Sequence, residues 1–184
     1  MMQCVKYLST LNLVNLANHL VANTLSNAGN SGSECNFYRL YKWRTCRKGF
    51  EEAKHAKKPI CLFIHKFTCP ACHSLKAKFV KSMRLMDLSD RFVMIHVEVG
   101  VKSRMTLNDK QYHPDGKYVP RILFFTPDGE LIKEAYNKHP SVDKDTQYFY
   151  SSAPQVVETM LFVLKDYCKD AIPVTFDYEQ WNWE

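Results

Sequence analysis

The sequence lacks any apolar run long enough to cross a membrane as a helix, which takes about 20 residues. It also has no acidic residue before Glu34 and no arginine before Arg39. An N-terminal stretch without acidic residues is typical of a targeting peptide, whereas a mitochondrial presequence is rich in arginine. Residues 1–35 are therefore expected to form a leader or a flexible N-terminal segment rather than part of a folded domain.

Negative charge is scarce in the body of the chain. Of the 25 lysines and arginines, only Lys6 precedes residue 34 and none follows residue 169, while four of the 19 acidic residues lie beyond residue 169. Residues 34–169 thus carry 24 basic against 15 acidic residues. The basic residues are scattered and accompany no aromatic recognition motif, so we expect a solvated basic face and no nucleic-acid partner. Residues 171–184 form an acidic, aromatic tail.

The seven cysteines are an odd number, which excludes a fully paired intramolecular disulfide framework. Two of them, Cys69 and Cys72, form the one C-x-x-C motif, and no second such pair or spaced histidine pair completes a four-ligand zinc site. The pattern Cys69 to His73 also matches the C-x-x-C-H haem-attachment motif. The apolar strand that precedes the motif argues against haem, and we expect neither a metal nor a cofactor.

The Cys69-Pro70-Ala71-Cys72 motif stands where a strand is expected to meet a helix. The apolar run 60–65 precedes it, and a helical pattern follows it. A C-x-x-C motif at such a junction suits thiol–disulfide exchange, because the unpaired N–H groups of the helix N-terminus stabilise a thiolate. We expect Cys69 to be the nucleophile and Cys72 the resolving thiol, with Pro70 tolerated in the first helical turn.

The remaining pattern predicts one α/β domain over residues 36–170. The expected elements are helices over 46–57, 70–84 and 153–169, strands over 60–65, 92–97 and 121–126, a turn at 87–90, a long loop over 99–118, and a fourth strand over 130–136 antiparallel to the third. Val119-Pro120 precedes the third strand, at a place suited to a cis peptide bond.

This arrangement resembles the thioredoxin fold, in which a cis-proline loop faces the dithiol and pairs with extended substrate peptide. More narrowly, the stretches His65–Lys76 and Pro114–Phe124 are similar to those of the small endoplasmic-reticulum-resident thioredoxin-domain and anterior-gradient family. The resemblance implies a single thioredoxin-like domain with a central mixed sheet flanked by helices. It also implies a protein thiol–disulfide oxidoreductase in the endoplasmic reticulum lumen or outside the cell.

The resemblance and the motif together define the expected site. Cys69 and Cys72 are the expected catalytic residues, Val119 and Pro120 the expected substrate-binding residues, and Lys66, Pro70 and Ala71 the expected supporting residues. The expected partners are protein thiols and disulfides, together with glutathione. The alternative function is that of a client-binding or signalling protein of the anterior-gradient type, without catalysis.

Three residues depart from the usual thioredoxin pattern. Phe63 stands six residues before Cys69, where thioredoxins and disulfide isomerases often hold a buried carboxylate, and His65 and His96 are the candidates to replace its role in proton transfer. Thr68 replaces the usual aromatic residue before the first cysteine, which predicts a less apolar rim. The middle pair Pro-Ala predicts a reduction potential between the extremes of about −270 and −120 mV found in such proteins.

Overall fold

A computed structural model describes residues 35–100 and 110–168. The predicted leader up to residue 34, the predicted tail and residues 101–109 of the long loop lie outside this range. The elements are α2 (Cys46–Ala56), β1 (Ile60–His65), α3 (Pro70–Val80), α4 (Met83–Ser89), β2 (Val93–Glu98), the 3-10 turn η1 (Lys110–Tyr112), β3 (Arg121–Phe125) and α5 (Ala153–Tyr167). Within the described ranges, no helix combines the length and the apolar character that crossing a bilayer requires.

The three strands form one mixed sheet in the order β2-β1-β3. Strand β1 runs parallel to β2 and antiparallel to β3, so that Leu62 lies opposite Ile95 on one side and Leu123 on the other. Because β1 is central, all six of its residues are buried, which explains its continuous apolar run. The predicted α/β class with a central mixed sheet is confirmed.

Single-residue bridges extend the sheet at both edges. Arg44 pairs in parallel with Ile95 beyond β2, and Leu131 pairs in antiparallel fashion with Phe125 beyond β3. Two backbone hydrogen bonds hold the second bridge, from Thr126 N to Glu130 O and from Ile132 N to Phe124 O. The sheet therefore has five strand positions, and each of the two outer positions consists of a single bridging residue.

The fourth strand predicted over residues 130–136 is wrong. After the bridge at Leu131 the chain turns, and Ala135 N bonds to Ile132 O. The physical reason lies in the sequence itself, because Lys133 and Glu134 are consecutive exposed residues that break the period of two required by a half-buried strand. The adjoining stretch of β3 is covered by the later chain, where Ile122 N donates to Tyr148 O.

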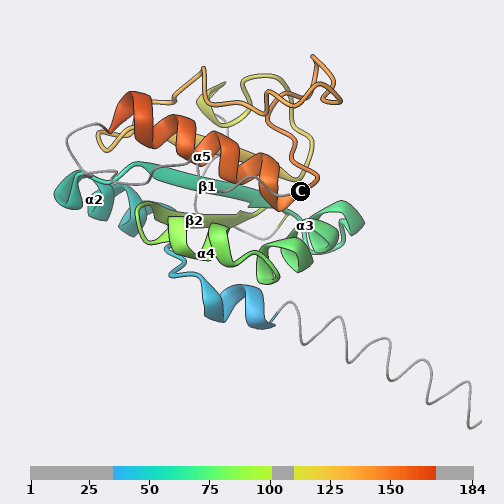
Figure 1. Ribbon diagram of the computed structural model, residues 1–184, viewed down its shortest axis with the longest axis horizontal. Helices are drawn as coiled ribbons and strands as arrows, with labels where there is room; N and C mark the ends of the chain where they lie inside the picture. Colours follow the sequence, from blue (N-terminus) through green and yellow to red (C-terminus); the bar gives the residue numbers. More distant parts are fainter. Residues whose placement is uncertain (1–34, 101–109, 169–184) are drawn as a thin grey trace, which may run out of the picture.

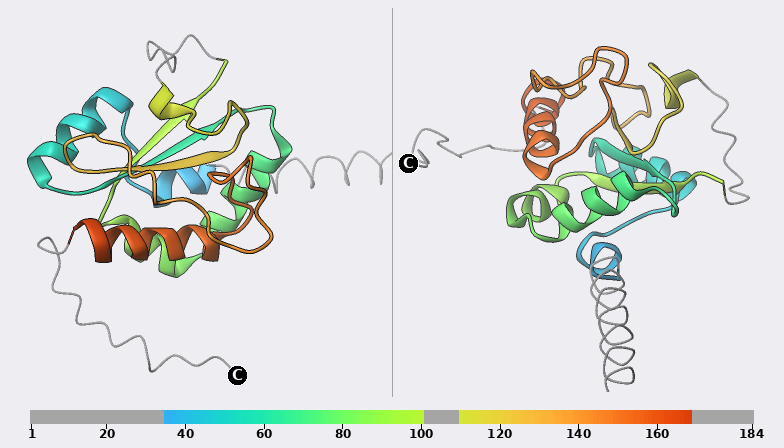
Figure 2. Two further views of the ribbon diagram at one scale, coloured as in Figure 1. Left: turned by 90° about the horizontal axis from the view of Figure 1, so that it is seen from above. Right: turned by 90° about the vertical axis from the view of Figure 1, so that its right-hand side faces the viewer.

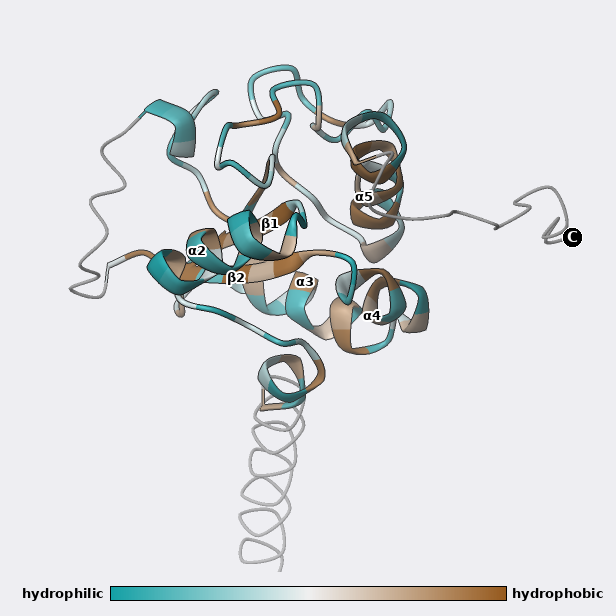
Figure 3. Cartoon of the chain, turned by 90° about the vertical axis from the view of Figure 1, so that its left-hand side faces the viewer, coloured by the Kyte–Doolittle hydropathy of each residue, from teal (hydrophilic) through white to brown (hydrophobic). Residues whose placement is uncertain are grey.

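Helices cover both faces of the sheet (Figures 1 and 2). Side chains of alternating β1 residues divide the core, with Cys61 and Phe63 facing α3, α4 and α5, and Leu62 and Ile64 facing α2. Figure 3 shows the strands coloured largely as hydrophobic, whereas the helices around them carry both hydrophilic and hydrophobic residues. Residues 35–40 add a helical turn that the sequence did not predict, and its Phe37 is buried against Phe63.

The helix predicted over residues 70–84 is two helices. Helix α3 ends at Val80, and Ser82 begins α4 by accepting a hydrogen bond from the Leu85 N–H at 3.3 Å. A serine that caps a new helix competes with continuation of the old one, which accounts for the break. As a result, residues 87–89, predicted to begin a turn, are still helical.

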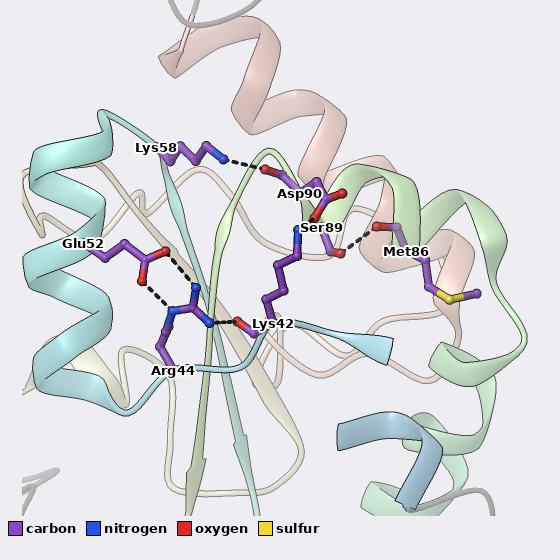
Figure 4. A network of polar contacts seen from close by, with 7 residues as sticks. All are labelled: Lys42, Arg44, Glu52, Lys58, Met86, Ser89 and Asp90. Atoms are coloured by element: carbon purple, nitrogen blue, oxygen red, sulfur yellow. Dashed lines mark hydrogen bonds and ion pairs between the residues drawn. The ribbon is translucent and has the colours of Figure 1, made fainter. Parts of the chain in front are cut away.

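Charged side chains tie the chain that precedes α2 to the body of the domain (Figure 4). The guanidinium of Arg44 binds both carboxylate oxygens of Glu52 in α2. Lys42 forms an ion pair with Asp90 at the end of α4, and Lys58 donates to the Asp90 carbonyl. These contacts are exposed or partly so, and we expect each to contribute little to stability while fixing the position of the segment.

Candidate functional site

Cys69 is the N-cap residue of α3. Its backbone is extended, with φ −94° and ψ 114°, and its sulfur accepts a hydrogen bond from the Cys72 N–H at 3.3 Å. Pro70 occupies the first helical position, where its fixed φ suits the helix and its missing N–H costs nothing. The sequence thus places a half-exposed thiol where the helix N-terminus favours negative charge on sulfur.

Cys72 lies one turn into α3 and is completely buried. Burial, followed by its hydrogen bond with Cys69, raises the pKa of the Cys72 thiol to about 12, against the smaller opposing effects of a backbone hydrogen bond from Lys66 and of the Lys76 charge. The two thiols therefore differ in their exposure to solvent, since Cys69 is half-exposed and Cys72 is buried. Both are free, as are the other cysteines within the described residues.

The loop before β3 lies next to this pair, because the end of β1 is the neighbour of the start of β3. The peptide bond between Val119 and Pro120 is cis. The Val119 carbonyl lies 3.7 Å from the Cys69 sulfur and accepts its S–H, although the two residues are 50 positions apart in the chain. Pro120 is buried and Val119 half-buried. The structure therefore brings the expected substrate-binding residues to the expected nucleophile.

A polar network holds the cis-proline loop in place. Arg121, buried at the start of β3, donates to the Tyr118 carbonyl and lies over the Tyr118 ring. The Tyr118 hydroxyl donates to Asp115 at 2.6 Å and accepts from the Tyr148 N–H at 3.1 Å. Burial, followed by the hydrogen bond to Asp115, raises the pKa of the Tyr118 phenol, so it stays a neutral donor. The sequence analysis did not assign this role to these residues.

The three expected supporting residues surround the dithiol at the surface. Lys66, Pro70 and Ala71 are all exposed. The Lys66 carbonyl accepts the Cys69 N–H at 3.2 Å, so this residue contacts the site through its backbone. Phe67 is 61% exposed and packs edge-on against His73. An exposed aromatic ring therefore lies two residues before Cys69, even though Thr68 replaces the usual aromatic residue.

The position where a buried carboxylate is often found is filled by an aromatic ring, which stacks on a histidine. Phe63 is fully buried and stacks on His65, and the Nε2 atom of His65 lies 3.5 Å from Nδ1 of His96. Burial, followed by the Lys76 charge, lowers the pKa of His65 to about 3 and also lowers that of His96. Both imidazoles are therefore neutral and weakly basic, which makes them poor acceptors for the Cys72 proton.

Lys76 is the residue at this site that the sequence analysis overlooked. It is only 1% exposed, on the face of α3 that also buries Cys72, Leu75 and Phe79. The spacing 72, 75, 76, 79 is that of one helical face and marks Lys76 as inward-pointing. Because a lysine is usually exposed, this spacing was not interpreted as evidence that Lys76 is buried.

Among the described residues, no group of three or more His, Cys, Asp or Glu side chains is placed to hold a metal ion.

The described domain has a counterpart among known protein families. Residues 42–127 match the family model described as Thioredoxin-like. Among solved structures, a disulphide isomerase from Xylella fastidiosa superimposes with a TM-score of 0.42 and 18% sequence identity, over 64% of this chain and 86% of that one. With its mixed sheet and the family match, the chain carries a thioredoxin-like domain.

Within that class, the chain is similar to the anterior gradient proteins. It is 31% identical to anterior gradient protein 2-B of Xenopus laevis over 110 residues, which cover 60% of this chain and 61% of that protein. It is 31% identical over 85 residues to anterior gradient protein 3 of Mus musculus, covering 46% and 48% of the two chains. The chain spans about half the length of the first curated relatives it matches. The resemblance stated from the motifs is confirmed.

Proposed function

We propose that this protein is a thiol–disulfide oxidoreductase that acts on protein disulfides through Cys69 and Cys72. The observation that carries the proposal is the position of the Cys69 sulfur. It caps α3, accepts the Cys72 N–H and lies 3.7 Å from the Val119 carbonyl that precedes the cis proline. These contacts support the proposal that Cys69 is the nucleophile, Cys72 its resolving partner and the Val119–Pro120 loop the edge that binds peptide.

The proposed reaction with a client disulfide has two displacements. The Cys69 thiolate attacks one client sulfur, and the client's S–S bond breaks to release a thiolate that takes up a proton. Cys72 then loses its proton and attacks the Cys69 sulfur, which forms the Cys69–Cys72 disulfide and releases the second client thiol. Two electrons pass from the protein dithiol to the client, and the reverse sequence oxidises a client dithiol.

The proposed substrate-binding edge is the Val119–Pro120 loop. An extended client segment would lie beside this backbone as an added strand, which recognises main-chain groups and tolerates many side chains. The Arg121–Tyr118–Asp115 network supports this role, because it fixes the loop before any client binds. Glutathione is the proposed small-thiol partner, and the similarity to the anterior gradient proteins supports work in the endoplasmic reticulum lumen or outside the cell.

Two serine variants test this function against a purely client-binding role. We expect Cys69→Ser to abolish reduction and oxidation of a disulfide-containing client, because no nucleophile remains. We expect Cys72→Ser to accumulate a Cys69–client mixed disulfide, because the resolving thiol is gone, with turnover at least about 100-fold lower in both variants. Cys46→Ser is the matched control, since Cys46 lies in α2 away from the dithiol. If both variants act on the client as the parent does, the protein is a binding module.

A further inference from the structure

Lys76 places an amine beneath the dithiol, inside the protein. It follows Cys72 by four residues in α3, so the two side chains lie on the same face of the helix, one turn apart. The Lys76 Nζ atom donates to the Tyr38 hydroxyl at 3.0 Å and lies 5.1 Å and 5.7 Å from the ring centroids of Tyr38 and Phe37. A hydroxyl acceptor and two aromatic faces are partners that suit an ammonium ion.

Several described side chains from other elements face this amine. His65 from β1 and His96 from β2 face it with imidazoles that burial keeps uncharged, and Tyr38 closes the site from the segment before α2. Glu98, at the end of β2, is the acidic group that acts on His96. Because the Lys76 side chain is only 1% exposed, water screens its charge poorly, and its effect on a nearby sulfur is strong.

We propose that Lys76 is a positioning residue for the resolving step, in which its buried ammonium favours the Cys72 thiolate over the thiol. The inference rests on the proposed exchange function and adds to it the group that replaces the missing carboxylate. A buried carboxylate would act by accepting a proton from the thiol. The proposed role of Lys76 is instead electrostatic, through the effect of its positive charge on the Cys72 sulfur.

The Lys76 charge is needed in the second displacement, in which Cys72 resolves the mixed disulfide. Burial raises the pKa of Cys72 to about 12, so the thiolate is a small fraction of the total at neutral pH, and the Lys76 charge opposes that rise. In the mixed disulfide, Cys72 releases its proton to water, its thiolate attacks the Cys69 sulfur, and the bond from Cys69 to the client breaks. The client sulfur leaves as a thiolate and takes up a proton. The first displacement by Cys69 does not require a Cys72 thiolate.

Replacing Lys76 by methionine separates the two displacements. Each unit by which the thiol pKa rises reduces the thiolate fraction about tenfold and increases its nucleophilicity about threefold, so resolution slows about threefold per unit. We expect Lys76→Met to slow resolution at least about threefold. Oxidised glutathione is the probe: the reduced protein is mixed with it, quenched with acid at intervals, and the Cys69–glutathione adduct is quantified by mass spectrometry.

The first displacement is measured separately in a Cys72→Ser background, where we expect Lys76→Met to leave the rate unchanged. A merely structural role for Lys76 would alter both steps. Lys78→Met is the matched control, because Lys78 is exposed on the same helix, and it should resolve the adduct at the parent rate. Tyr38→Phe, which removes the hydroxyl that holds the ammonium, should slow resolution in the same way and decides the matter if Lys76→Met does not fold.

Resolution at the parent rate in the folded variants would overturn the role of Lys76. That result leaves the proposed function intact, because the parent protein would still form and resolve the adduct. A parent protein that forms no adduct and no Cys69–Cys72 disulfide would contradict the proposed function itself. The two failures are therefore distinguishable in one experiment.

Discussion

The buried imidazole of His65 shows how one residue sets the chemistry beneath the dithiol. Its ring stacks on Phe63 and is 1% exposed, so protonation would place a second positive charge beside Lys76 in a medium that solvates it poorly. The ring consequently stays neutral. Proton exchange with Cys72 is left to water, and electrostatic support of the thiolate is left to the amine of Lys76.

Because His65 is neutral in the folded protein, the free energy of unfolding should decrease at acidic pH. Its pKa is about 3 in the folded protein, against about 6.5 in an unfolded chain, so the unfolded state binds more protons between these values. The free energy of unfolding should therefore fall as pH drops from about 6.5 towards 3, by up to about 1.4 kcal/mol per pH unit for this group. Urea unfolding between about pH 7 and pH 5 measures the slope before the carboxylates titrate.

His65→Phe should flatten that slope by about 1 kcal/mol per pH unit, because phenylalanine can stack on Phe63 and does not titrate. His55→Gln is the matched control, since it removes an exposed imidazole from α2 where His65→Phe removes a buried one. A slope equal to the parent's in His65→Phe would show that His65 titrates alike in both states.

At the scale of the elements, the site depends on how closely α2 packs against the sheet. Gly49 is buried in α2, and a Cβ atom at this position would lie 2.4 Å from Cδ1 of Ile95 in β2. Ile95 is itself fully buried, so a Cβ atom at position 49 requires a shift inside the core. Strand β2 lies beside β1, and β1 leads directly into the Cys69 loop, so this packing helps to place Cys69.

Gly49→Ala should therefore destabilise the protein by about 1–2 kcal/mol. Alanine favours a helix by about 1 kcal/mol over glycine, but overpacking a tight core costs about 1–3 kcal/mol or more, and a 2.4 Å approach lies at the severe end. Guanidinium denaturation gives the difference, with Lys54→Ala on the exposed face of α2 as the control. A Gly49→Ala variant as stable as the parent would show that α2 and β2 can separate at no cost.

The elements that were predictable from the sequence are those specified by local pattern. The uninterrupted apolar run gave β1, and proline at the first helical position marked the start of α3. The break after Val80 was not predicted because the apolar spacing continues through it, and one serine side chain decides the boundary. The prediction of a fourth strand was wrong because the consecutive charges at Lys133 and Glu134 break the alternation that a half-buried strand requires.

At the scale of the whole molecule, the site joins two segments that are distant in sequence. The dithiol and the cis-proline loop meet because β1 and β3 are antiparallel neighbours, so the end of β1 lies beside the start of β3. The motif and the family resemblance made this meeting predictable. The role of Lys76 was not, because burial of a long basic side chain depends on Phe37 and Tyr38, whose segment no sequence pattern placed against α3.

The most direct test of the account is a redox titration of the full chain in glutathione buffers, with the disulfides located by mass spectrometry. We predict one redox-active pair, Cys69–Cys72, with a reduction potential between about −260 and −120 mV. Cys61 and Cys168, buried in the core, should stay reduced throughout. A potential below about −260 mV would contradict the predicted redox poise. No disulfide between Cys69 and Cys72 at any ratio of oxidised to reduced glutathione would contradict the central claim.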